Sequence, residues 1–418
     1  MNWKDDIKIK LEKTKNAYKS ITGLTTEEKN KFLENLAQNI KKESPNILKS
    51  NKKDVEKAQM AGYSNAFIDR LSLSENNIEK IISSIENVRN LPDPVGKIIW
   101  ENKRPNGLII KRKRVPIGVI GIIYESRPDV TVESSILCIK AGNCVILKGG
   151  KEAKNSNKKL VEIIKKSLKE ASLPEDCVNL IYKGGRKSVK HLLKFHQYID
   201  LIIPRGGEEL IKTVVENSSI PVIKHYKGIC HTYIDKYTNI DMALKVTFNA
   251  KVQRPGTCNA TETLLVHKDI AKEFLPEMAK MFEEAGVEMR GCEETRKILP
   301  FIKKASEDDW KIEYLDKIIS IKVVNSIEEA IEHIGKYGTS HSDAIITENK
   351  EMAEKFLNMV DSAAVYHNAS TRFTDGGEFG LGAEIGISTD KIHARGPMGL
   401  EELTIYKYIV YGNGQIRE

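Results

Sequence analysis

Cysteine is scarce in this sequence, and its six residues do not form the pattern of a metal site or a disulfide scaffold. Small secreted proteins that depend on disulfides have a much higher density of cysteine. Zinc sites pair cysteines or histidines at short spacing, and the sequence contains no C-x-x-C. We therefore expect reduced thiols and no metal site. The six positions are Cys138, Cys144, Cys177, Cys230, Cys258 and Cys292.

Long hydrophobic runs are also missing. The longest apolar stretches, such as residues 117–124, fall far short of the ~20 residues that a membrane-spanning helix needs. The N-terminal residues 1–6 alternate in charge and contain no apolar segment, so they do not predict a secretory signal. We expect a cytoplasmic protein without a membrane partner.

The charge balance is close to that of an ordinary globular protein. The sequence has 66 Lys+Arg against 58 Asp+Glu, a formal net charge of +8. The lysines alternate with acidic residues, as in residues 158–170, and no basic patch is interleaved with aromatic residues. We interpret the excess as a solvated basic surface and expect no nucleic-acid partner. Because one core stops growing at roughly 250–300 residues, two or three lobes are expected.

The N-terminal part, residues 1–90, is predicted to be helical. Apolar residues recur at helical spacing from Leu33 to Ile40, and Thr25 with Glu28 predicts a capping box ahead of them. From residue 118 onward, short β-branched runs alternate with helical segments, which is typical of parallel sheets. The alternation occurs twice and predicts two α/β lobes. The predicted strands are 119–123, 144–147, 178–181 and 201–203, then 263–266, 318–324, 344–346 and 363–366.

A β-hairpin is predicted between the helical part and the first lobe. Two strand-like runs, 97–101 and 108–114, flank Asn106–Gly107, the strongest short hairpin signal. The tail, residues 403–411, is a further strand that could lie beside them. Such a ribbon is marginal alone and its edges have no evident partner in either lobe. We therefore expect a homodimer or a higher homo-oligomer that depends on these strands.

Residues that directly follow a strand are candidates for ligand binding in an open α/β sheet. Lys148-Gly-Gly-Lys151 follows one strand; its small residues and two ammonium groups suit a phosphate, and an exposed turn is the alternative. Gly206–Gly207 open a helix after another strand, where free amides would attract a phosphate, or they form a plain turn. The G-x-G-x-x-G fingerprint and the P-loop are both missing.

Cys258 is the candidate nucleophile. It follows Pro255–Gly256 in a polar loop before a predicted buried strand, whereas the other cysteines lie in apolar runs or helices. An unpaired cysteine is more often a small buried hydrophobe, but polar neighbours and Arg254 favour a reactive thiol. A glycine-rich segment at residues 370–384 could close over a small anion through Arg372.

Seven motifs spread along the chain carry a family resemblance. They are Val115-Pro-Ile-Gly-Val-Ile-Gly-Ile-Ile-Tyr-Glu-Ser-Arg-Pro, Leu147-Lys-Gly-Gly-Lys-Glu, Ile203-Pro-Arg-Gly-Gly, Gln253-Arg-Pro-Gly-Thr-Cys-Asn, Ser340-His-Ser-Asp-Ala-Ile, Thr371-Arg-Phe-Thr-Asp-Gly-Gly and Ala394-Arg-Gly-Pro-Met-Gly-Leu. From about residue 10 to its end, the chain resembles the γ-glutamyl phosphate reductases (glutamate-5-semialdehyde dehydrogenases) of the aldehyde dehydrogenase superfamily. The resemblance implies the second step of proline biosynthesis, in which L-glutamyl 5-phosphate and NADPH give L-glutamate 5-semialdehyde, phosphate and NADP⁺. It also implies a possible functional association with glutamate 5-kinase.

The fold implied by the resemblance is aldehyde dehydrogenase-like α/β, with a cofactor lobe, a catalytic lobe and a small β oligomerisation element. The segments expected are a helical entry at 1–96, a hairpin arm at 97–114, a Rossmann-like cofactor domain at 115–228, a catalytic domain at 229–370, a glycine-rich substrate- and cofactor-side segment at 371–402, and an oligomerisation strand at 403–418.

The resemblance also implies roles for individual residues. Cys258 matches the superfamily nucleophile, and Lys148 matches the lysine that meets the adenosine ribose or its phosphate. Gly206 and Gly207 lie at the helix start under the cofactor, and Glu313 corresponds to the glutamate on the nicotinamide ribose. The implied chemistry is a thioester on the nucleophile that accepts hydride.

Departures from the broad superfamily pattern refine this expectation. Ser126 stands in place of the oxyanion asparagine, and His225 in place of the glutamate that activates water in hydrolytic relatives. Lys151 replaces a glutamate that accepts the ribose 2′-hydroxyl in NAD-using relatives, which favours NADPH. The phosphate and carboxylate ends of the substrate have three candidate partners, each of which could instead form a structural ion pair: Arg127, Arg254 and Arg372.

Two other functions stay open on the sequence alone. One is an oxidising aldehyde dehydrogenase that hydrolyses its thioester, which a general-base carboxylate near Cys258 would support. The other is a nucleic-acid-binding protein that uses the basic charge and has no catalytic activity.

Overall fold

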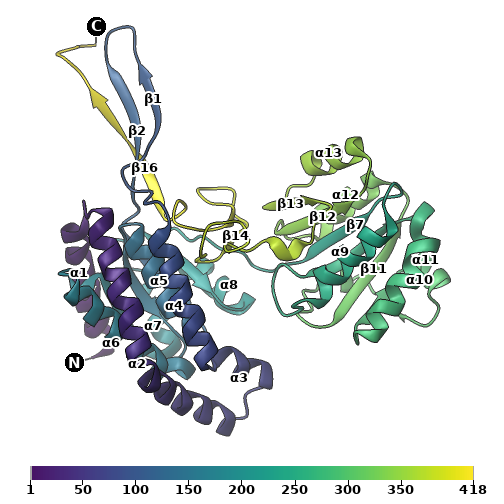
Figure 1. Ribbon diagram of the computed structural model, residues 1–418, viewed down its shortest axis with the longest axis horizontal. Helices are drawn as coiled ribbons and strands as arrows, with labels where there is room; N and C mark the ends of the chain where they lie inside the picture. The colour runs from purple at the N-terminus through teal and green to yellow at the C-terminus, as the bar shows by residue number, and fades with distance from the viewer. Residues whose placement is uncertain (1, 418) are drawn as a thin grey trace. The chain divides into compact units, whose positions relative to one another are not determined.

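The computed structural model describes residues 2–417 of the chain (Figure 1). The chain divides into two compact units. Unit 1 contains the chain up to Lys224, Gly380–Gly386 and the segment from Met398 onward, and unit 2 contains His225–Phe379 and Ile387–Pro397. Each unit is organised around its own parallel sheet, as the two alternations in the sequence predict.

The helical N-terminal part is confirmed. It consists of α1 (Trp3–Ile21), α2 (Thr26–Met60), α3 (Asn65–Leu71) and α4 (Glu75–Asn90). The capping box at the start of α2 is also present: Glu28 N–H donates to Thr25 Oγ1 at 3.2 Å, and Thr25 N–H donates to Glu28 Oε2 at 2.8 Å.

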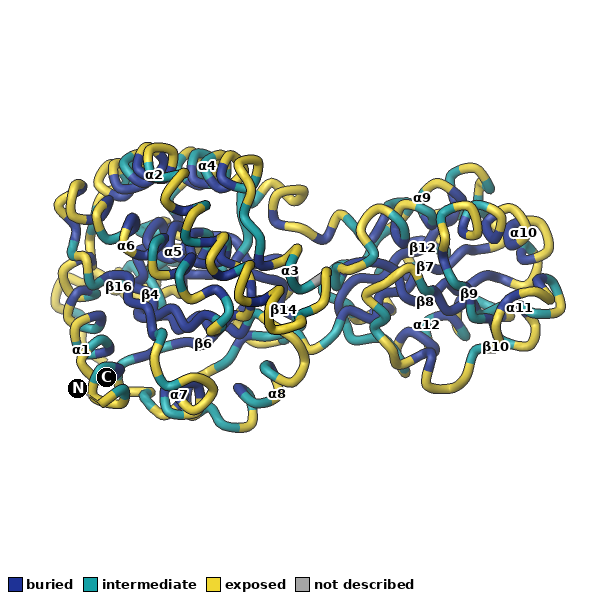
Figure 2. The backbone as a smooth tube through the Cα atoms, turned by 90° about the horizontal axis from the view of Figure 1, so that it is seen from below, coloured by how far each residue is buried: buried dark blue, intermediate teal, exposed yellow. Residues whose placement is uncertain are grey.

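The parallel sheet of unit 1 has four strands in the order β5-β4-β3-β6. Its strands are almost fully buried (Figure 2). The chain runs from β3 to β4 and β5 on one side, then crosses to β6 on the other side of β3. The strand order therefore reverses at β3, and the carboxyl ends of the strands meet at this point. The elements are β3 (Val119–Tyr124), α5 (Asp129–Lys140), β4 (Cys144–Lys148), η1 (Lys151–Ala153), α6 (Lys154–Glu170), η2 (Glu175–Cys177), β5 (Val178–Leu180), α7 (Gly185–Leu192), β6 (Leu201–Arg205) and α8 (Glu208–Asn217).

The predicted hairpin and tail strand form one antiparallel sheet that extends from the rest of unit 1 (Figure 1). β1 (Ile98–Lys103) pairs with β2 (Ile109–Pro116), and β16 (Thr404–Tyr411) pairs with the other edge of β2 along its full length. The hairpin loop closes through Gly107, whose φ is +89° and whose N–H donates to Arg104 O at 2.9 Å. We call these three strands the arm.

The sheet of unit 2 has seven parallel strands in the order β10-β9-β11-β8-β7-β12-β13. The sequence predicted four of them and missed β7, β9 and the short β10. β7 is fully buried but contains polar residues, Cys230-His-Thr-Tyr-Ile, so it does not have the continuous apolar pattern of a central strand. Its polar side chains bond to neighbouring strands instead: His231 Nδ1 lies 2.9 Å from Asp343 Oδ1, and the hydroxyls of Thr232 and Thr261 are 2.7 Å apart.

The elements of unit 2 are the strands of this sheet, the helices that accompany them and a short antiparallel strand pair. They are β7 (Cys230–Ile234), α9 (Ile240–Val252), β8 (Thr261–His267), α10 (Lys268–Glu284), β9 (Glu288–Gly291), α11 (Glu293–Ile298), β10 (Lys303–Lys304), η3 (Asp309–Lys311), β11 (Ile318–Val324), α12 (Ile327–Tyr337), β12 (Ser342–Ile346), α13 (Lys350–Met359), β13 (Ala364–His367), η4 (Thr371–Phe373), β14 (Ile387–Ser388) and β15 (Gly396–Pro397). In the described part of the chain, no helix combines the length and apolar character that a bilayer span would require.

Candidate active site

In unit 1, the predicted ligand-binding residues gather at the carboxyl ends of the parallel strands. Ser126 and Arg127 follow β3, Lys148 ends β4, and Gly206–Gly207 follow β6. The turn after β3 and the turn after β6 are bonded to each other, since Gly207 N–H donates to Glu125 Oε2 at 2.9 Å. These residues therefore lie at the reversal point of the sheet, where α/β proteins bind dinucleotides.

Lys148 is largely buried at the end of β4. Its side chain is 7% exposed, and Nζ donates to Gly149 O at 2.8 Å. Burial lowers the pKa of Lys148 below the usual lysine range, and the nearby Glu152 carboxylate opposes this shift. Gly149 next to it has no room for a side chain, because a Cβ there would lie 2.2 Å from Asn157 Nδ2. Glycine at this position thus allows the end of β4 to pack closely against Asn157.

The start of α8 has the features of an anion or dinucleotide site. Gly207 is its N-cap and supplies no side-chain cap, and a helix N-terminus attracts anions. A Cβ at Gly206 would lie 2.6 Å from Glu125 Oε2. Gly206 thus allows the turn to pack against the end of β3.

Lys151 lies farther out, exposed at the start of η1. Beside it is a surface pocket that receives three lysines and one aromatic ring, together with the carboxylates of Asp54 and Glu152. Both carboxylates have local partners: Asp54 caps α6 through Ser156, and Glu152 accepts from Tyr63 Oη at 3.1 Å. The lysines and the aromatic residue are Lys57, Lys151, Lys154 and Tyr63.

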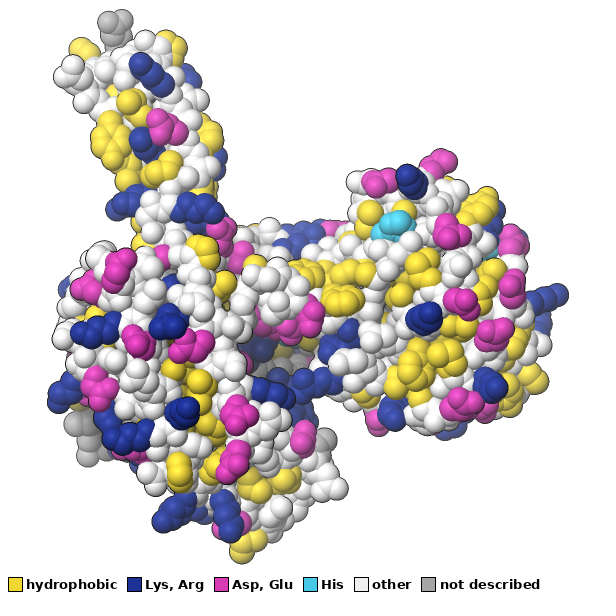
Figure 3. All heavy atoms as spheres, in the orientation of Figure 1, with side chains coloured by type: hydrophobic (Ala, Val, Ile, Leu, Met, Phe, Trp, Pro, Cys, Tyr) yellow, Lys and Arg dark blue, Asp and Glu magenta, His cyan; other side chains and the backbone are white. Residues whose placement is uncertain are grey.

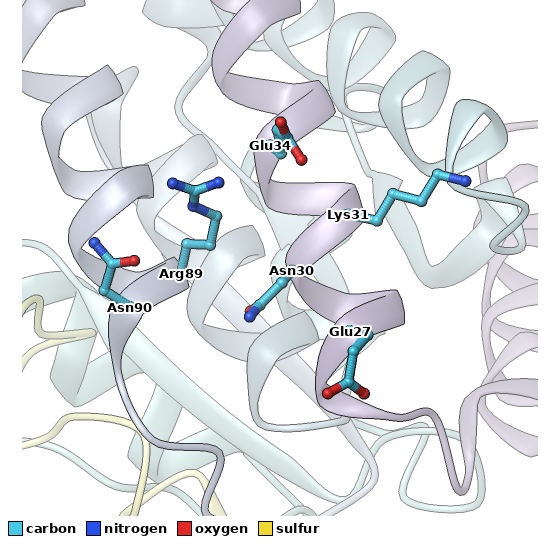
Figure 4. Close-up of a pocket in the computed structure, with 6 residues that line it drawn as sticks. All are labelled: Glu27, Asn30, Lys31, Glu34, Arg89 and Asn90. Carbon is cyan, nitrogen blue, oxygen red and sulfur yellow. The ribbon is translucent and has the colours of Figure 1, made fainter.

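Another surface pocket lies between α2 and α4 (Figure 4). Its lining mixes both charges and contains no candidate nucleophile and no residue predicted to bind ligand. We assign it no function. The lining residues are Glu27, Asn30, Lys31, Glu34, Arg89 and Asn90.

In unit 2, Cys258 lies at the amino ends of the parallel strands, whereas the candidate residues of unit 1 lie at the carboxyl ends. It precedes β8, while His225 precedes β7 and His341 precedes β12. The donor atoms of Cys258, His225 and His341 all lie within 4.8 Å of one another. His341 is fully buried, whereas Cys258 and His225 are partly exposed. The partly exposed thiol is therefore flanked by two imidazoles.

The backbone of Cys258 packs directly on Gly228. A Cβ at Gly228 would lie 1.8 Å from Cys258 O and 2.7 Å from its Cα, so only glycine fits there. Gly228 N–H in turn donates to Glu313 Oε1 at 2.9 Å. Glu313, which is expected to bind the cofactor ribose, thus contacts Gly228, and Gly228 in turn contacts the loop that contains Cys258.

Two of the predicted arginines also lie at this edge. Arg372 Nε donates to Gln253 Oε1 at 2.9 Å, and another nitrogen of its guanidinium bonds to Asn259 Oδ1. Burial lowers the pKa of Arg372, the cation of Arg254 lowers it further, and Cys258 acts in the opposite direction. No carboxylate of residues 2–417 forms a salt bridge with Arg254. Two neighbouring guanidinium groups beside the thiol favour an anionic ligand.

The third arginine, Arg127, lies in unit 1 in a different environment. It is exposed in the turn after β3, and its N–H donates to Glu125 O at 2.7 Å. Its cation also acts on Glu133, whose pKa is raised to about 7 by burial and by Asp129, with Arg205 and Arg127 opposing.

Four of the remaining cysteines are buried, unlike Cys258. Burial raises the pKa of Cys138, Cys144 and Cys230 well above the usual thiol range. Cys292 is different from the expected apolar position, since it is partly exposed at the N-cap of α11. None of the six forms a disulfide, as the sequence predicts.

Residues 2–315 match the aldehyde dehydrogenase family. The chain belongs to this family. It is 55% identical over 409 residues to the gamma-glutamyl phosphate reductase of Thermodesulfovibrio yellowstonii, covering 98% of each chain. The crystal structure of gamma-glutamyl phosphate reductase from Thermotoga maritima superimposes with a TM-score of 0.96 at 51% identity, over 98% of this chain and 99% of that chain.

A more distant structure shows how widely the aldehyde dehydrogenase fold extends. Glyceraldehyde-3-phosphate dehydrogenase GapN from Methanocaldococcus jannaschii, complexed with NADP, has a TM-score of 0.69 at 17% identity, over 98% of this chain and 95% of that chain. The predicted aldehyde dehydrogenase-like fold is confirmed. Aldehyde dehydrogenases use nicotinamide cofactors, and the buried Lys148 at the end of β4 and the start of α8, which has no side-chain cap, fit such a group.

Sequence reasoning missed three features of the aldehyde dehydrogenase site. His341 occurs in a motif that the resemblance rests on, but nothing in the sequence places it beside Cys258. Gly228 has no turn signature in the sequence. Glycine is required there because a side chain would collide with Cys258 O. Asn259 Nδ2 donates to Thr374 O at 2.9 Å, and this hydrogen bond connects the nucleophile loop to the glycine-rich segment.

We predict that Gly228→Ala displaces the nucleophile loop. Moving Cys258 by the ~1–2 Å that the Cβ requires should lower the turnover number at least about 100-fold and change the alkylation rate of the Cys258 thiol. Gly335→Ala is the matched control, because a Cβ at this α12 position meets no atom within 4 Å. Alkylation followed by peptide mass mapping measures the effect, and an unchanged Cys258 rate in Gly228→Ala would contradict the packing account.

Proposed function

We propose that this enzyme reduces L-glutamyl 5-phosphate to L-glutamate 5-semialdehyde with NADPH and releases phosphate, the second step of proline biosynthesis. Support comes from relatives named gamma-glutamyl phosphate reductase that match at more than half identity over nearly the full length. The single observation on the structure that carries the proposal is the partly exposed Cys258 thiol between two imidazoles and two guanidinium groups.

The first chemical step is acyl transfer to Cys258. Sγ attacks the acyl carbon, the bond to the phosphate oxygen breaks, and phosphate leaves with its electron pair. The thiol proton can pass to the imidazole of His225 or His341, both of which have a nitrogen within 4.8 Å of Sγ. The product is a thioester on Cys258.

Anion binding next to the thiol would assist this step. Arg254 and Arg372 lie on the Cys258 side of the site, and the phosphate is the substrate group directly bonded to the carbon under attack. We assign these two arginines to the phosphate, because the guanidinium fork matches its oxygens. Ser126 and Arg127, in the turn after β3 of unit 1, stay candidates for substrate binding.

A reduced nicotinamide bound at the site would supply a hydride to the thioester carbon, and a proton from the His225 or His341 imidazolium would complete the thiohemiacetal on Cys258. Cys258 then leaves as the aldehyde forms, which regenerates the free thiol. Lys148, Gly206, Gly207 and Glu313 are proposed to hold the cofactor. The amide of Cys258 and a further donor hold the oxyanion.

Hydrolysis of the thioester is disfavoured by the lack of a suitable carboxylate. The cluster around the thiol contains histidines and no acid. Glu262 is buried and paired with Lys251 Nζ at 2.5 Å, and burial raises its pKa to about 7. Glu313 is bonded to Gly228 N–H. These contacts favour acyl-phosphate chemistry over the oxidising alternative.

The direct test of the proposed function is the reverse reaction. With L-glutamate 5-semialdehyde and NADP⁺, we expect NADPH to form only when phosphate or arsenate is present, with at least about 100-fold less turnover without either anion, a difference of about 2.7 kcal/mol in the barrier. Cys258→Ala should show no turnover in either buffer. Rapid NADPH formation in phosphate-free buffer would support the hydrolytic alternative instead.

Arg254→Gln tests the assignment of the phosphate. We expect the KM for phosphate in the reverse reaction to rise about tenfold, or about 1.4 kcal/mol, with little change in the KM for the semialdehyde. Lys245→Gln, which removes one exposed positive charge from α9 of the same unit, controls for net charge. A rise in the semialdehyde KM alone would move Arg254 to the carboxylate end.

The preference for NADPH over NADH is proposed to depend on Lys151. Its ammonium group lies at a pocket that also receives Lys57 and Lys154, which suits the 2′-phosphate of NADPH. Lys151→Glu should raise the KM for NADPH about tenfold or more and leave that for NADH within about twofold. Lys169→Glu, at the far end of α6, is the charge-matched control. An unchanged ratio of the two KM values would remove Lys151 from the cofactor site.

The arm is proposed to join two copies of this chain. Two neighbouring residues of β1 are both exposed: Ile99 is 38% and Trp100 36% exposed. On β16, Tyr408 and Val410 are 59% and 55% exposed. Hydrophobic side chains and strand edges are therefore left uncovered on the arm (Figure 3). A second copy would bury both.

Deleting residues 405–418 should convert the oligomer to monomers or aggregates. This truncation removes the exposed part of β16 and keeps the buried Leu403 and Thr404. Deleting only residues 412–418, which lie beyond β16, is the control and should leave the oligomer intact. Sedimentation measures both, and a native oligomer in the longer deletion would contradict the proposal.

Other expectations from the sequence are kept as proposals. They are the cytoplasmic location, the functional association with glutamate 5-kinase, the cofactor role of residues 115–228 and the catalytic role of residues 229–370.

A further inference from the structure

The three donors beside the nucleophile have the chemistry of a metal site. Cys258 supplies a sulfur, and His225 and His341 supply one ring nitrogen each, all within 4.8 Å of one another. One thiolate with two imidazoles is a donor set that suits Zn²⁺. The sequence gives no sign of it, because the ligands come from three separate segments ahead of three different strands.

The geometry is close to what a tetrahedral ion needs. Bond lengths of ~2.0–2.3 Å place neighbouring donors ~3.4–3.6 Å apart, so donors that lie within 4.8 Å of one another have to approach by at most about 1.4 Å. Cys258 and His225 are partly exposed and belong to loop segments, which allows their side chains to make this adjustment and gives an ion access from solvent.

The outer contacts of both histidines also match those of metal ligands. His225 Nδ1 lies 2.9 Å from Ile387 O, and His341 Nδ1 lies 2.8 Å from Ser342 Oγ. Ser342 Oγ is in turn 2.6 Å from Thr374 Oγ1. Metal-bound histidines usually hold their second ring nitrogen in such a bond, which fixes the orientation of the ring.

We propose that His225, Cys258 and His341 bind one Zn²⁺ ion and that this binding reversibly inhibits the enzyme. The thiol loses its proton to solvent, a Zn–S bond forms, and no group changes its oxidation state. Three protein ligands leave the fourth position to water. Because the sulfur that must attack the acyl carbon is then bonded to the metal, the enzyme is inactive until a chelator removes the ion. The inference concerns metal binding and holds whichever acyl substrate the enzyme uses.

Cobalt(II) is the spectroscopic probe for this site. Titration of the full-length protein with Co²⁺ alone should give a sulfur-to-cobalt charge-transfer band that saturates at one equivalent, and Zn²⁺ should displace it. Cys258→Ser should abolish the band. His225→Asn and His341→Asn should weaken Co²⁺ binding at least about tenfold. Cys292→Ser is the matched control, since Cys292 is the other partly exposed thiol, and should leave the band unchanged.

Three outcomes would overturn the proposal. They are the absence of a charge-transfer band in the native protein, its persistence in Cys258→Ser, and native affinity in both histidine variants. His341 is fully buried, so His225→Asn carries the histidine test if His341→Asn does not fold. In the native enzyme, Zn²⁺ should inhibit turnover at the same Zn²⁺ concentration that displaces Co²⁺. A chelator should reverse this inhibition.

Discussion

The close packing of Cys258 on Gly228 is the constraint on which the candidate site in unit 2 depends. With room for no side chain between them, the nucleophile loop is held against the segment that leads into β7. That segment also contains His225 and the N–H that Glu313 accepts. One backbone contact therefore sets the position of the Cys258 thiol relative to an imidazole and a carboxylate. The positions of these groups follow from the order of the strands rather than from flexible side-chain contacts.

The two units use opposite ends of their parallel strands. In unit 1, Lys148 and Gly206–Gly207 lie at carboxyl ends, as is usual in open α/β sheets. In unit 2, Cys258 and His341 precede their strands. The difference is consistent with the proposed roles, because a helix N-terminus attracts the phosphates of a cofactor, whereas a nucleophile needs nearby side chains that can move a proton and hold an anion.

The sequence predicted the N-terminal helices, most strands and the arm because each has a local signature, and Cys258 as the nucleophile stays a prediction. Thr25 with Glu28 marked a helix start, and Asn106–Gly107 marked the hairpin. β7 was missed because its polar residues bond to side chains of strands far away in the sequence, as His231 does to Asp343. His341 was recognised only as part of a motif, since its proximity to Cys258 depends on β12 lying beside β7, and no local pattern encodes that pairing.

The central claim is that the acyl group is carried on Cys258, and it is tested most directly by trapping the thioester. L-glutamyl 5-phosphate generated in place by glutamate 5-kinase should, without NADPH, add one glutamyl group to the enzyme, and peptide mapping by mass spectrometry should locate it on Cys258. Addition of NADPH should then remove the adduct and release the semialdehyde. An adduct on another residue, or full turnover with no adduct and an unmodified Cys258, would contradict the account.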